Sequence, residues 1–367
     1  MTSRFIYLIY FYSVFGFSQN QFTLSGSIYE SEGQETLIGA NIIFPKASTG
    51  ATTNEYGFYS ITLPKGTYDI KVSYLGYYSI SKTIILNKNL TQNFSLEANT
   101  DTLDEIVLKT DAERVNIKTA QMSVNTLNSN TIKQIPVVFG EADLVKAITL
   151  LPGISSGGEG TPGFNVRGGS NDQNLILLDE ATLFNSSHLF GFFSVFNPDA
   201  IKNLKLYKGG IPAKYGGRVA SVLDIYQKEG NKNEFSANGG IGLVSSRVLF
   251  EGPLKKEKGS FLFGGRSTYA HLFLPLFDID NIAYFYDINT KLSYRLDIDN
   301  KIYLSGYFGR DVFNVSNSFE NTYGNTVVNF RWNHLFSNKL FSNLSLIYSD
   351  YYYGLDLNFV GFKWNSG

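Results

Sequence analysis

The six residues Val328–Asn333, VNFRWN, alternate strictly between apolar and polar side chains. Successive side chains of a β-strand point to opposite faces of a sheet, so this stretch predicts a strand with one apolar and one polar face. The same alternation occurs at Lys291–Asp297 and Tyr353–Phe359, and half of the aromatic residues follow Asn233. Such strands are typical of a transmembrane β-barrel with its apolar face outward. The pattern by itself also fits a soluble β-sandwich whose polar face meets water.

The composition excludes several functions. With a net charge of −1 and only 17% charged residues, the 367-residue chain has no strong positive field for nucleic acid. Cysteine is absent, which excludes disulfides, thiol nucleophiles, cysteine-bound zinc and iron–sulfur clusters. His188, His271 and His334 are too far apart in sequence for a local metal motif. We therefore predict no metal, no cofactor and no nucleic-acid partner.

The N-terminus predicts export. Arg4 precedes a short apolar run at Phe5–Phe17, and Gly16–Ser18 provides a small-x-small end. These features are typical of a secretory signal peptide, here residues 1–18. The run is shorter than the about 20 residues that a membrane-spanning helix needs. An exported chain without such a helix can enter a membrane only as a closed barrel, because lipid offers no partners for unpaired backbone groups.

The segment after the signal peptide predicts a small β-sandwich over residues 19–98. Gly66–Tyr74 alternates cleanly between apolar and polar side chains, and turn residues such as Asn54 and Gly76 recur between the apolar runs. Residues 99–120 are mostly polar and read as a linker. They contain one short apolar and acidic segment, Leu103–Leu108.

Residues 121–228 predict a compact α+β unit rich in glycine. Glu141–Leu151 has the apolar spacing of a helix with acidic residues in its first turn, and Pro152 ends it. Asn174–Asp179 and Ile201–Tyr207 read as strands.

Two strings in this unit match motifs of enzymes but stand in the wrong context. Gly153–Gly157 matches the G-x-S-x-G elbow of serine hydrolases, which needs a strand before its serine, Ser155, and a helix after it. Gly158–Gly163 matches G-x-G-x-x-G, which must follow a strand and open a helix. Here a helix precedes both strings. We read both as glycine loops and predict no catalytic residue; an exported hydrolase using Ser155 is a minor alternative.

Three stretches taken together resemble the plug domain of TonB-dependent outer-membrane receptors. They are Phe164–Gly169 (FNVRGG), Asn174–Asp179 and Leu206–Ile225 (LYKGGIPAKYGGRVASVLDI). Residues 21–98 resemble the carboxypeptidase-regulatory-like β-sandwich that often precedes such plugs, and Leu103–Leu108 resembles the TonB box. The resemblance implies a mainly β chain with these parts: an N-terminal β-sandwich at 19–98, a linker with the TonB box at 99–120, an α+β plug domain at 121–228, and the first strands of a truncated 22-stranded transmembrane β-barrel at 229–367.

The resemblance also implies a function, that of a receptor in the cell outer membrane rather than an enzyme. Its N-terminal domain would lie in the periplasm and its barrel in outer-membrane lipid. Such receptors import a scarce ligand, here an iron siderophore, cobalamin, an oligosaccharide or a peptide. The periplasmic C-terminal domain of TonB would grip the box and pull, so that the plug rearranges. The box residues would be Leu103, Asp104, Glu105, Ile106, Val107 and Leu108.

The β-branched residues of the box suit that role. Ile106 and Val107 favour an extended strand, which can add to an exposed sheet edge through main-chain hydrogen bonds. The alternative is that Leu103–Leu108 forms an eighth strand of the sandwich.

By motif position, Arg167 and Lys208 are the plug residues that would face barrel carboxylates and lock the plug in place. The family more often has Arg at position 208, so a bidentate fork becomes a point charge here. Arg167 alternatively only caps loop carbonyls. Glu180-Ala181 departs from the Gly-Pro of the family, which puts the turn there in doubt. The plug glycines, which permit sharp turns and close approach to the barrel, would be Gly168, Gly169, Gly209, Gly210, Gly216 and Gly217.

The expected barrel needs more chain than is present. At about 9–11 residues per strand, 22 strands require over ~200 residues. The segment after Asn233 supplies about six to eight strands. We therefore expect an N-terminal fragment or a truncated gene product. The alternatives to a working receptor are an exported β-domain binding or adhesion protein and a non-functional receptor fragment.

Overall fold

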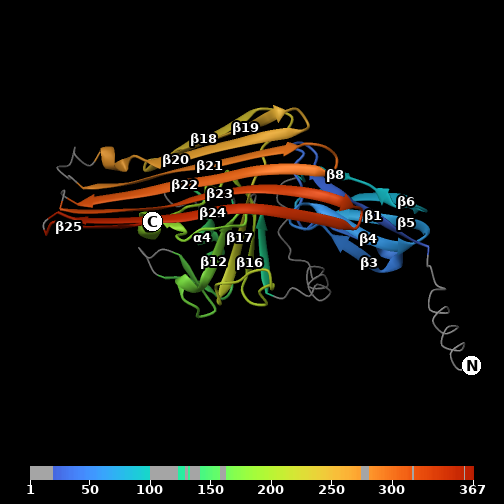
Figure 1. Ribbon diagram of the computed structural model, residues 1–367, viewed down its shortest axis with the longest axis horizontal. Coiled ribbons are helices and arrows are strands. Elements are labelled where there is room, and N and C mark those ends of the chain that lie inside the picture. Colours follow the sequence, from blue (N-terminus) through green and yellow to red (C-terminus); the bar gives the residue numbers. More distant parts are fainter. Residues whose placement is uncertain are drawn as a thin grey trace, which may run out of the picture. The chain divides into compact units, whose positions relative to one another are not determined.

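The computed structural model describes residues 20–99, 123–128, 131–132, 141–157, 163–273, 281–315, 318–358 and 360–367 (Figure 1). The chain forms two compact units, residues 1–102 with 335–342 and residues 103–334 with 343–367. The predicted signal peptide, residues 1–18, and the predicted TonB box, Leu103–Leu108, lie outside the described residues. No helix in the described part of the chain is long and apolar enough to cross a membrane.

The first unit contains two four-stranded sheets. The first sheet consists of β4 (Phe58–Pro64), β1 (Gln21–Glu30), β7 (Leu90–Thr91) and β8 (Phe94–Leu96). The second consists, in spatial order, of β3 (Thr49–Thr52), β2 (Asn41–Phe44), β5 (Gly66–Ser73) and β6 (Ile80–Leu86), with the 3₁₀ turn η1 (Pro45–Ala47) between β2 and β3. β1 runs antiparallel to β4 and parallel to β7 and β8.

The two sheets share one apolar core, which confirms the predicted β-sandwich. Leu24 and Ile28 of β1 and Ile70 and Val72 of β5 are at most 1% exposed and belong to this core. Asp69, between Tyr68 and Ile70, is exposed, as the alternation of β5 predicts. Burying each of these aliphatic side chains contributes about 1.5–3 kcal/mol, so the core stabilises the unit without any disulfide.

The second unit begins with a small α/β part, which we call the plug segment (the described residues from Ser123 to Gln227). Its five-stranded sheet has the order β13 (Ala181–Thr182), β12 (Asn174–Leu178), β17 (Ser221–Gln227), β16 (Ile201–Tyr207) and β9 (Val124–Asn128). β12 is parallel to β17, and the other neighbours pair antiparallel. The shorter elements are β10 (Ile154–Ser156), β11 (Phe164–Val166), β14 (Ser187–His188), β15 (Phe193–Ser194), η2 (Asn171–Gln173) and η3 (Leu189–Gly191).

The predicted helix of the plug segment is present but shorter than its apolar pattern. It is α4 (Leu144–Thr149), and it begins at Asp143, whose carboxylate accepts a hydrogen bond from the Lys146 backbone N–H at 3.0 Å. Asp143 therefore caps the helix instead of lying in its first turn. Leu144 and Ile148 are fully buried in the core of the plug segment.

Eight strands follow and form one sheet, which we call the wall sheet. In chain order, each next to the one before, they are β18 (Ser236–Ile241), β19 (Ser245–Lys255), β20 (Gly259–Thr268), β21 (Ile282–Arg295), β22 (Asn300–Val315), β23 (Phe319–Ser337), β24 (Leu340–Leu357) and β25 (Phe362–Ser366). The short turn η4 (Ala270–Leu272) follows β20. Pairing is antiparallel from β18 to β23 and between β24 and β25. Figure 1 shows these strands side by side.

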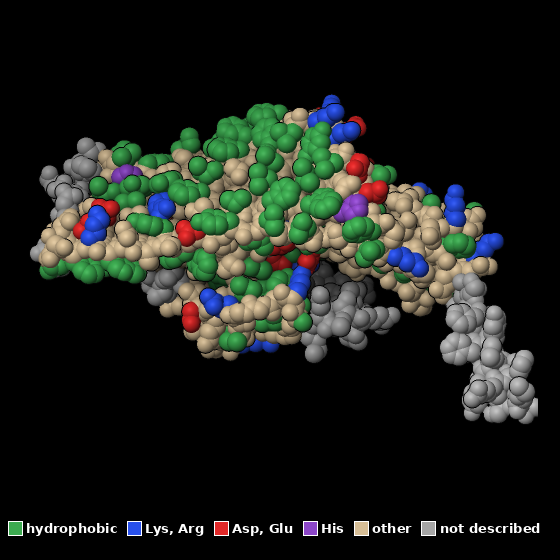
Figure 2. Space-filling model, in the orientation of Figure 1, with side chains coloured by type: hydrophobic (Ala, Val, Ile, Leu, Met, Phe, Trp, Pro, Cys, Tyr) green, Lys and Arg blue, Asp and Glu red, His purple; other side chains and the backbone are tan. Residues whose placement is uncertain are grey.

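The wall sheet has the two faces that the sequence predicts. Asn329 and Arg331 are buried, whereas Val328, Phe330 and Trp332 are 41%, 38% and 37% exposed. Hydrophobic side chains accordingly cover much of the surface over these strands (Figure 2). The prediction of a mainly β chain with a sandwich, an α+β plug and the first strands of a barrel is confirmed. A total of 22 strands stays a prediction.

The strand predicted at Tyr353–Phe359, which forms the end of β24, has its apolar and polar faces on the sides opposite to the prediction. Tyr351 packs against Phe184 of the plug segment with ring centroids 6.3 Å apart, so the odd-numbered residues of β24 face the plug segment. The apolar Leu355 is therefore on the inner side and the polar Asp356 on the outer side, opposite to our expectation. β24 has 18 residues, more than the about 9–11 of a strand that crosses a bilayer, so an apolar outer face is not required along its whole length.

Candidate functional site

The polar face of the wall sheet packs against the plug segment. We call the contacts between them the plug–wall interface. Lys291 of β21 and Arg331 of β23 lie on this face and are 3% and 5% exposed. A charge taken out of water costs several kcal/mol unless a partner compensates it. The partners of these charges therefore define how the plug segment is held.

Ion pairs connect the plug segment to the wall sheet. We expected basic plug residues to meet barrel carboxylates. Between the described parts of the plug segment and the wall sheet, four pairs join a plug carboxylate to a wall cation, whereas His188 meets two wall carboxylates. The pairs are Glu141–Arg266 at 2.8 Å, Asp179–Lys291 at 3.0 Å, Glu180–Arg331 at 3.6 Å, Asp199–Arg247 at 2.8 Å, and His188 with Asp287 at 3.1 Å and Asp311 at 2.7 Å.

The two predicted lock residues make their contacts inside the plug segment. The guanidinium of Arg167 donates from Nη2 to the hydroxyl of Ser123 at 2.9 Å, and Lys208 donates from Nζ to the carbonyl of Pro152 at 2.9 Å. Partial burial and the neighbouring Arg167 guanidinium lower the pKa of Lys208. A lock between these two residues and the wall stays a prediction.

The turn after β12 contacts three strands of the wall sheet. Asp179 and Glu180 have φ values of 48° and 73°, in the left-handed region that non-glycine residues rarely adopt. The carboxylate of Asp179 accepts from Lys291 Nζ at 3.0 Å and from the Gln227 backbone N–H at 3.2 Å. Its carbonyl accepts from the side-chain amide of Asn329. Two wall strands, β21 and β23, thus hold this single residue.

Contacts with the wall explain how position 180, where we expected a glycine, can hold a glutamate. A side chain in the left-handed region costs roughly 1–2 kcal/mol. The Glu180 carboxylate receives the hydroxyl of Ser345 on β24 and lies 3.6 Å from Arg331 Nη1. These contacts offset the backbone strain, so the departure from the expected motif adds a contact to the wall.

His188 of the plug segment faces two wall carboxylates. It is 1% exposed, with Nδ1 2.7 Å from Asp311 Oδ2 and Nε2 3.1 Å from Asp287 Oδ2. Its ring stacks on Phe285 at 4.1 Å between centroids. The next backbone N–H, of Leu189, donates to the other oxygen of Asp311 at 2.7 Å. The loop is therefore held at consecutive residues.

Arg266 of β20 extends this cluster. Its Nε donates to Asp287 Oδ2 at 2.9 Å, its Nη1 to Glu141 Oε1 at 2.8 Å and its Nη2 to the Ser194 carbonyl at 2.8 Å. The planar guanidinium holds its N–H donors in a fixed fork, which directs them to three separate partners at once. Arg266 thereby joins the start of α4 to β15 and to the wall.

The junction between β17 and β18 is also fixed to the wall. Glu229 is 4% exposed, and its Oε2 accepts from Lys232 at 3.1 Å and from Lys301 of β22 at 2.9 Å. Burial alone would raise the pKa of Glu229, but Lys232 and Lys301 outweigh it and hold the pKa well below its ordinary value. At Gly230, φ is 84° and a Cβ would lie 2.3 Å from the backbone oxygen of Phe261, so only glycine fits.

The predicted plug glycines act within the plug segment. Gly168, Gly210 and Gly217 have φ values of 83°, 59° and 82°, and a Cβ on Gly169 would lie 2.5 Å from the Cβ of Ala220. Turn formation and close packing therefore explain these positions. Gly209 and Gly216 lie in the connection between β16 and β17, together with Gly210 and Gly217. Close approach of the six glycines to the barrel stays a prediction.

Ser155 lies in β10, paired with Asn165 of β11. The nucleophile elbow requires a sharp turn from a strand into a helix. Ser155 therefore lies in a two-stranded ribbon, which is neither the elbow nor the glycine loop that we expected there.

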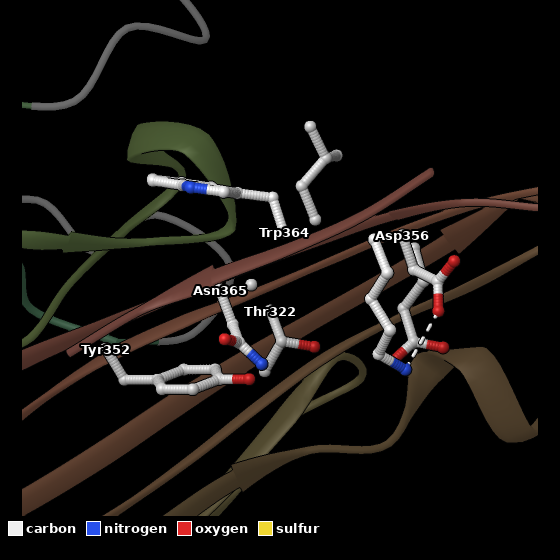
Figure 3. Close-up of a pocket in the computed structure, with 9 residues that line it drawn as sticks. Thr322, Tyr352, Asp356, Trp364 and Asn365 are labelled. Atoms are coloured by element: carbon white, nitrogen blue, oxygen red, sulfur yellow. Dashed lines mark ion pairs between the residues drawn. The ribbon is translucent and has the colours of Figure 1, made fainter. Parts of the chain in front are cut away.

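A shallow pocket of about 310 Å³, which includes open solvent, lies among β23, β24 and β25. Tyr352, Trp364 and Asn365 line it, and Figure 3 shows Asp356 at its other end in an ion pair with Lys363 at 3.1 Å. Glu320 also lines the pocket, so its charged groups are two carboxylates and one ammonium. The pocket is shallow and open to solvent, and we assign it no role.

The residues that carry the interface were not among the sequence predictions. The sequence feature that could have indicated the interface is the charge of Lys291 and Arg331 on the polar face of alternating strands. A charge that becomes buried there requires a partner. The sequence does not say which plug carboxylate that partner is. The sequence analysis named His188 only as one of three widely spaced histidines, and its partners Asp287 and Asp311 lie about a hundred residues further along the chain.

Comparison with known families matches two domains. Residues 24–108 match the CarboxypepD_reg-like domain, and residues 116–222 match the TonB-dependent Receptor Plug Domain. No curated protein matches the chain.

Solved structures of receptors are similar to part of the chain. The siderophore receptor PirA from Acinetobacter baumannii is 17% identical with a TM-score of 0.49, over 64% of this chain and 41% of PirA. PirA from Pseudomonas aeruginosa gives 18% and 0.46, over 65% and 42%. The alcaligin outer membrane receptor FauA from Bordetella pertussis gives 14% and 0.48, over 65% and 40%. The chain thus spans about two fifths of these relatives.

Proposed function

Because this chain carries the plug domain of TonB-dependent receptors behind a CarboxypepD_reg-like domain, we propose that it works as an outer-membrane receptor for TonB-energised uptake of a scarce ligand. The observation that carries the proposal is the plug–wall interface. A glycine-rich α/β segment covers the polar face of a sheet whose other face is apolar and exposed. That arrangement suits a barrel wall in lipid around a filled lumen.

In this proposal the parts follow the order of the chain. Residues 19–98 lie in the periplasm, 99–120 carry the TonB box, 121–228 form the plug, and residues from 229 onward begin the barrel in outer-membrane lipid. The ligand is an iron siderophore, cobalamin, an oligosaccharide or a peptide. When the C-terminal domain of TonB pulls on Leu103–Leu108, the ion pairs of the plug–wall interface determine how much of the plug moves.

The TonB box is tested by binding of the purified periplasmic domain of TonB to the detergent-solubilised chain. Ile106→Pro removes a backbone donor from the proposed strand. We expect its affinity for TonB to fall at least about tenfold, because strand addition depends on main-chain hydrogen bonds. Thr110→Pro, just outside the box, is the matched control and should bind as the unchanged chain does. Equal binding of all three proteins would refute the assignment of the box.

The membrane location is tested by extraction. If the chain is a receptor in the membrane, its extraction should require detergent. The extracted protein should also migrate differently on gels before and after heating, since intact barrels resist unfolding in detergent. An exported adhesion or binding protein made of soluble β-domains would be released without detergent. Release into buffer would therefore favour that alternative over the receptor.

A further inference from the structure

The buried histidine of the plug–wall interface has a geometry that depends on its proton. We propose that His188 is a proton-dependent latch, in which the imidazolium bridges Asp287 and Asp311 of the wall and loss of its proton loosens the plug segment. The inference rests on the proposed function only in taking the plug segment as the part that moves. The bridge itself follows from contacts between described residues.

The distances to the two carboxylates require two donors on one ring. Nδ1 is 2.7 Å from Asp311 Oδ2, and Nε2 is 3.1 Å from Asp287 Oδ2. Ionised carboxylates only accept hydrogen bonds, and a neutral imidazole has a single N–H. Only the protonated ring can therefore donate to both. Hydrogen bonds between ionised groups are about twice as strong as neutral ones, so the proton decides how firmly the loop is held.

The charges around the ring favour that proton. Asp287 of β21 and Asp311 of β22 face it directly, and Arg266 of β20 and Glu141 of the plug segment complete the ion-pair chain. Without the proton, these groups set three carboxylates against one guanidinium; with it, two cations face three anions. Two hydroxyls, of Tyr307 on β22 and Tyr323 on β23, border the cluster and carry no charge at neutral pH.

The direction of the pH effect follows from these contacts. Burial alone would lower the pKa of His188, but the carboxylates of Asp311 and Asp287 outweigh burial and raise it. A raised pKa means that the latch contributes fully below the ordinary histidine value of about 6.5. The contribution is lost as the pH rises through the higher pKa of the folded protein.

The neutral ring also has a partner. The hydroxyl of Tyr307 lies 3.1 Å from Nε2. When Nε2 has lost its proton, this hydroxyl can donate to it, while Arg266 keeps its own bonds to Asp287. Deprotonation therefore removes one charge-assisted hydrogen bond, but each ring nitrogen keeps a hydrogen-bond partner. The result is a weaker contact between an intact loop and an intact wall, which is what a reversible latch requires.

The protonation state is tested by NMR of the full chain in detergent micelles with ¹³C-labelled histidine. Only three histidines are present, so His271→Gln and His334→Gln assign the signal of His188. We expect this signal to titrate above the ordinary histidine value, and Asp311→Asn to move its midpoint down. A midpoint at or below about 6.5 in the unchanged chain would overturn the proposal.

The effect on the loop is tested with a single introduced cysteine, which the cysteine-free chain allows. Ser186→Cys places a thiol at a side chain that is 3% exposed, next to the latch. Its labelling rate is divided by that of Ser81→Cys, an exposed position on β6, to remove the pH dependence of the thiol itself. We expect the ratio to rise about tenfold as His188 loses its proton. A change of this size is of the order expected for the loss of one hydrogen bond to a charged group.

The matched variant is His188→Gln, which is neutral at every pH. Its normalised labelling should be high and independent of pH. If it showed the same pH dependence as the unchanged His188, the latch would be wrong. Heat-dependent gel migration checks that each variant still folds. None of these measurements uses TonB or a ligand, so failure of the latch and failure of the proposed function give different results.

Discussion

Individual charged residues decide how the plug segment is held. Arg266, 4% exposed, donates to Asp287, Glu141 and the Ser194 carbonyl. A buried pair adds little net stability relative to apolar packing, but removal of one partner leaves an uncompensated charge. The interface is therefore sensitive to single substitutions on either side of it.

The first prediction concerns this guanidinium. Arg266→Leu should lower the free energy of unfolding by about 3–5 kcal/mol, because Asp287 and Glu141 then stay buried without their cation. The measurement is denaturant unfolding of the detergent-solubilised chain. Arg218→Leu is the control, since Arg218 is exposed and donates to the carbonyl of its neighbour Gly217; it should change stability by less than about 0.5 kcal/mol. Equal effects of the two variants would contradict the role of Arg266.

The second prediction separates backbone strain from side-chain contact at Glu180, where φ is 73°. Glu180→Ala and Glu180→Gly both lose the contacts with Arg331 and Ser345. Glycine adopts the left-handed conformation without strain, so the alanine variant should be less stable than the glycine variant by about 1 kcal/mol. Unfolding curves of the two variants measure this difference. Equal stabilities would mean that the strain is absent.

At the scale of elements, the junction between β17 and β18 is the fixed end of the plug segment. Glu229 binds Lys232 and Lys301, and the hydroxyl of Ser260 on β20 donates to the Glu229 carbonyl at 2.7 Å. At the other end of the plug segment in chain order is the edge strand β9, which pairs only with β16 among the described strands. The two ends thus differ in how many contacts bind them to the rest of the unit.

The third prediction tests the junction. Gly230→Ala should destabilise the chain by about 2 kcal/mol or more, because φ is 84° and the new Cβ would meet backbone of Phe261, which cannot move aside. Gly216→Ala has open space around it and no positive φ, and should stay within about 0.5 kcal/mol. Thermal unfolding of both variants in detergent measures the difference. A mild effect at Gly230 would mean that the junction adapts more easily than the structure implies.

For the whole molecule, two buried groups give the plug–wall interface opposite pH limits. The pKa of Glu229 is held low by Lys232 and Lys301, so its contribution is present above the ordinary glutamate value and is lost as the pH falls through the lowered pKa. The contribution of His188, whose pKa is raised, is lost in the other direction. The interface should therefore be most stable between the two.

The fourth prediction follows from that pair. The temperature at which the folded gel band disappears should pass through a maximum with pH. Glu229→Gln should flatten the acid side of the curve and His188→Gln the alkaline side. Each variant serves as the control for the other. If either substitution changed both sides equally, the two groups would not act independently, and the assignment of one group to each limit would be wrong.

The period-two pattern of Val328–Asn333 by itself determined that this region is a strand with unlike faces, because side-chain direction alternates whatever the partner strand is. The same holds for Gly66–Tyr74 in the sandwich, and the glycine-rich stretches at Phe164–Gly169 and Leu206–Ile225 carried the resemblance to a plug. These are local properties of the chain, and local sequence encodes them.

Only the tertiary structure decided which charges meet. Asp179 and Lys291 are separated by 112 residues, and His188 and Asp311 by 123, so their pairing depends on how the strands are ordered and in which register. For this reason our expectation named Arg167 and Lys208 but not the carboxylates that meet Arg266 and Lys291 of the wall. The sequence shows that a buried Lys or Arg needs a partner; the fold determines which carboxylate lies within 3 Å of it.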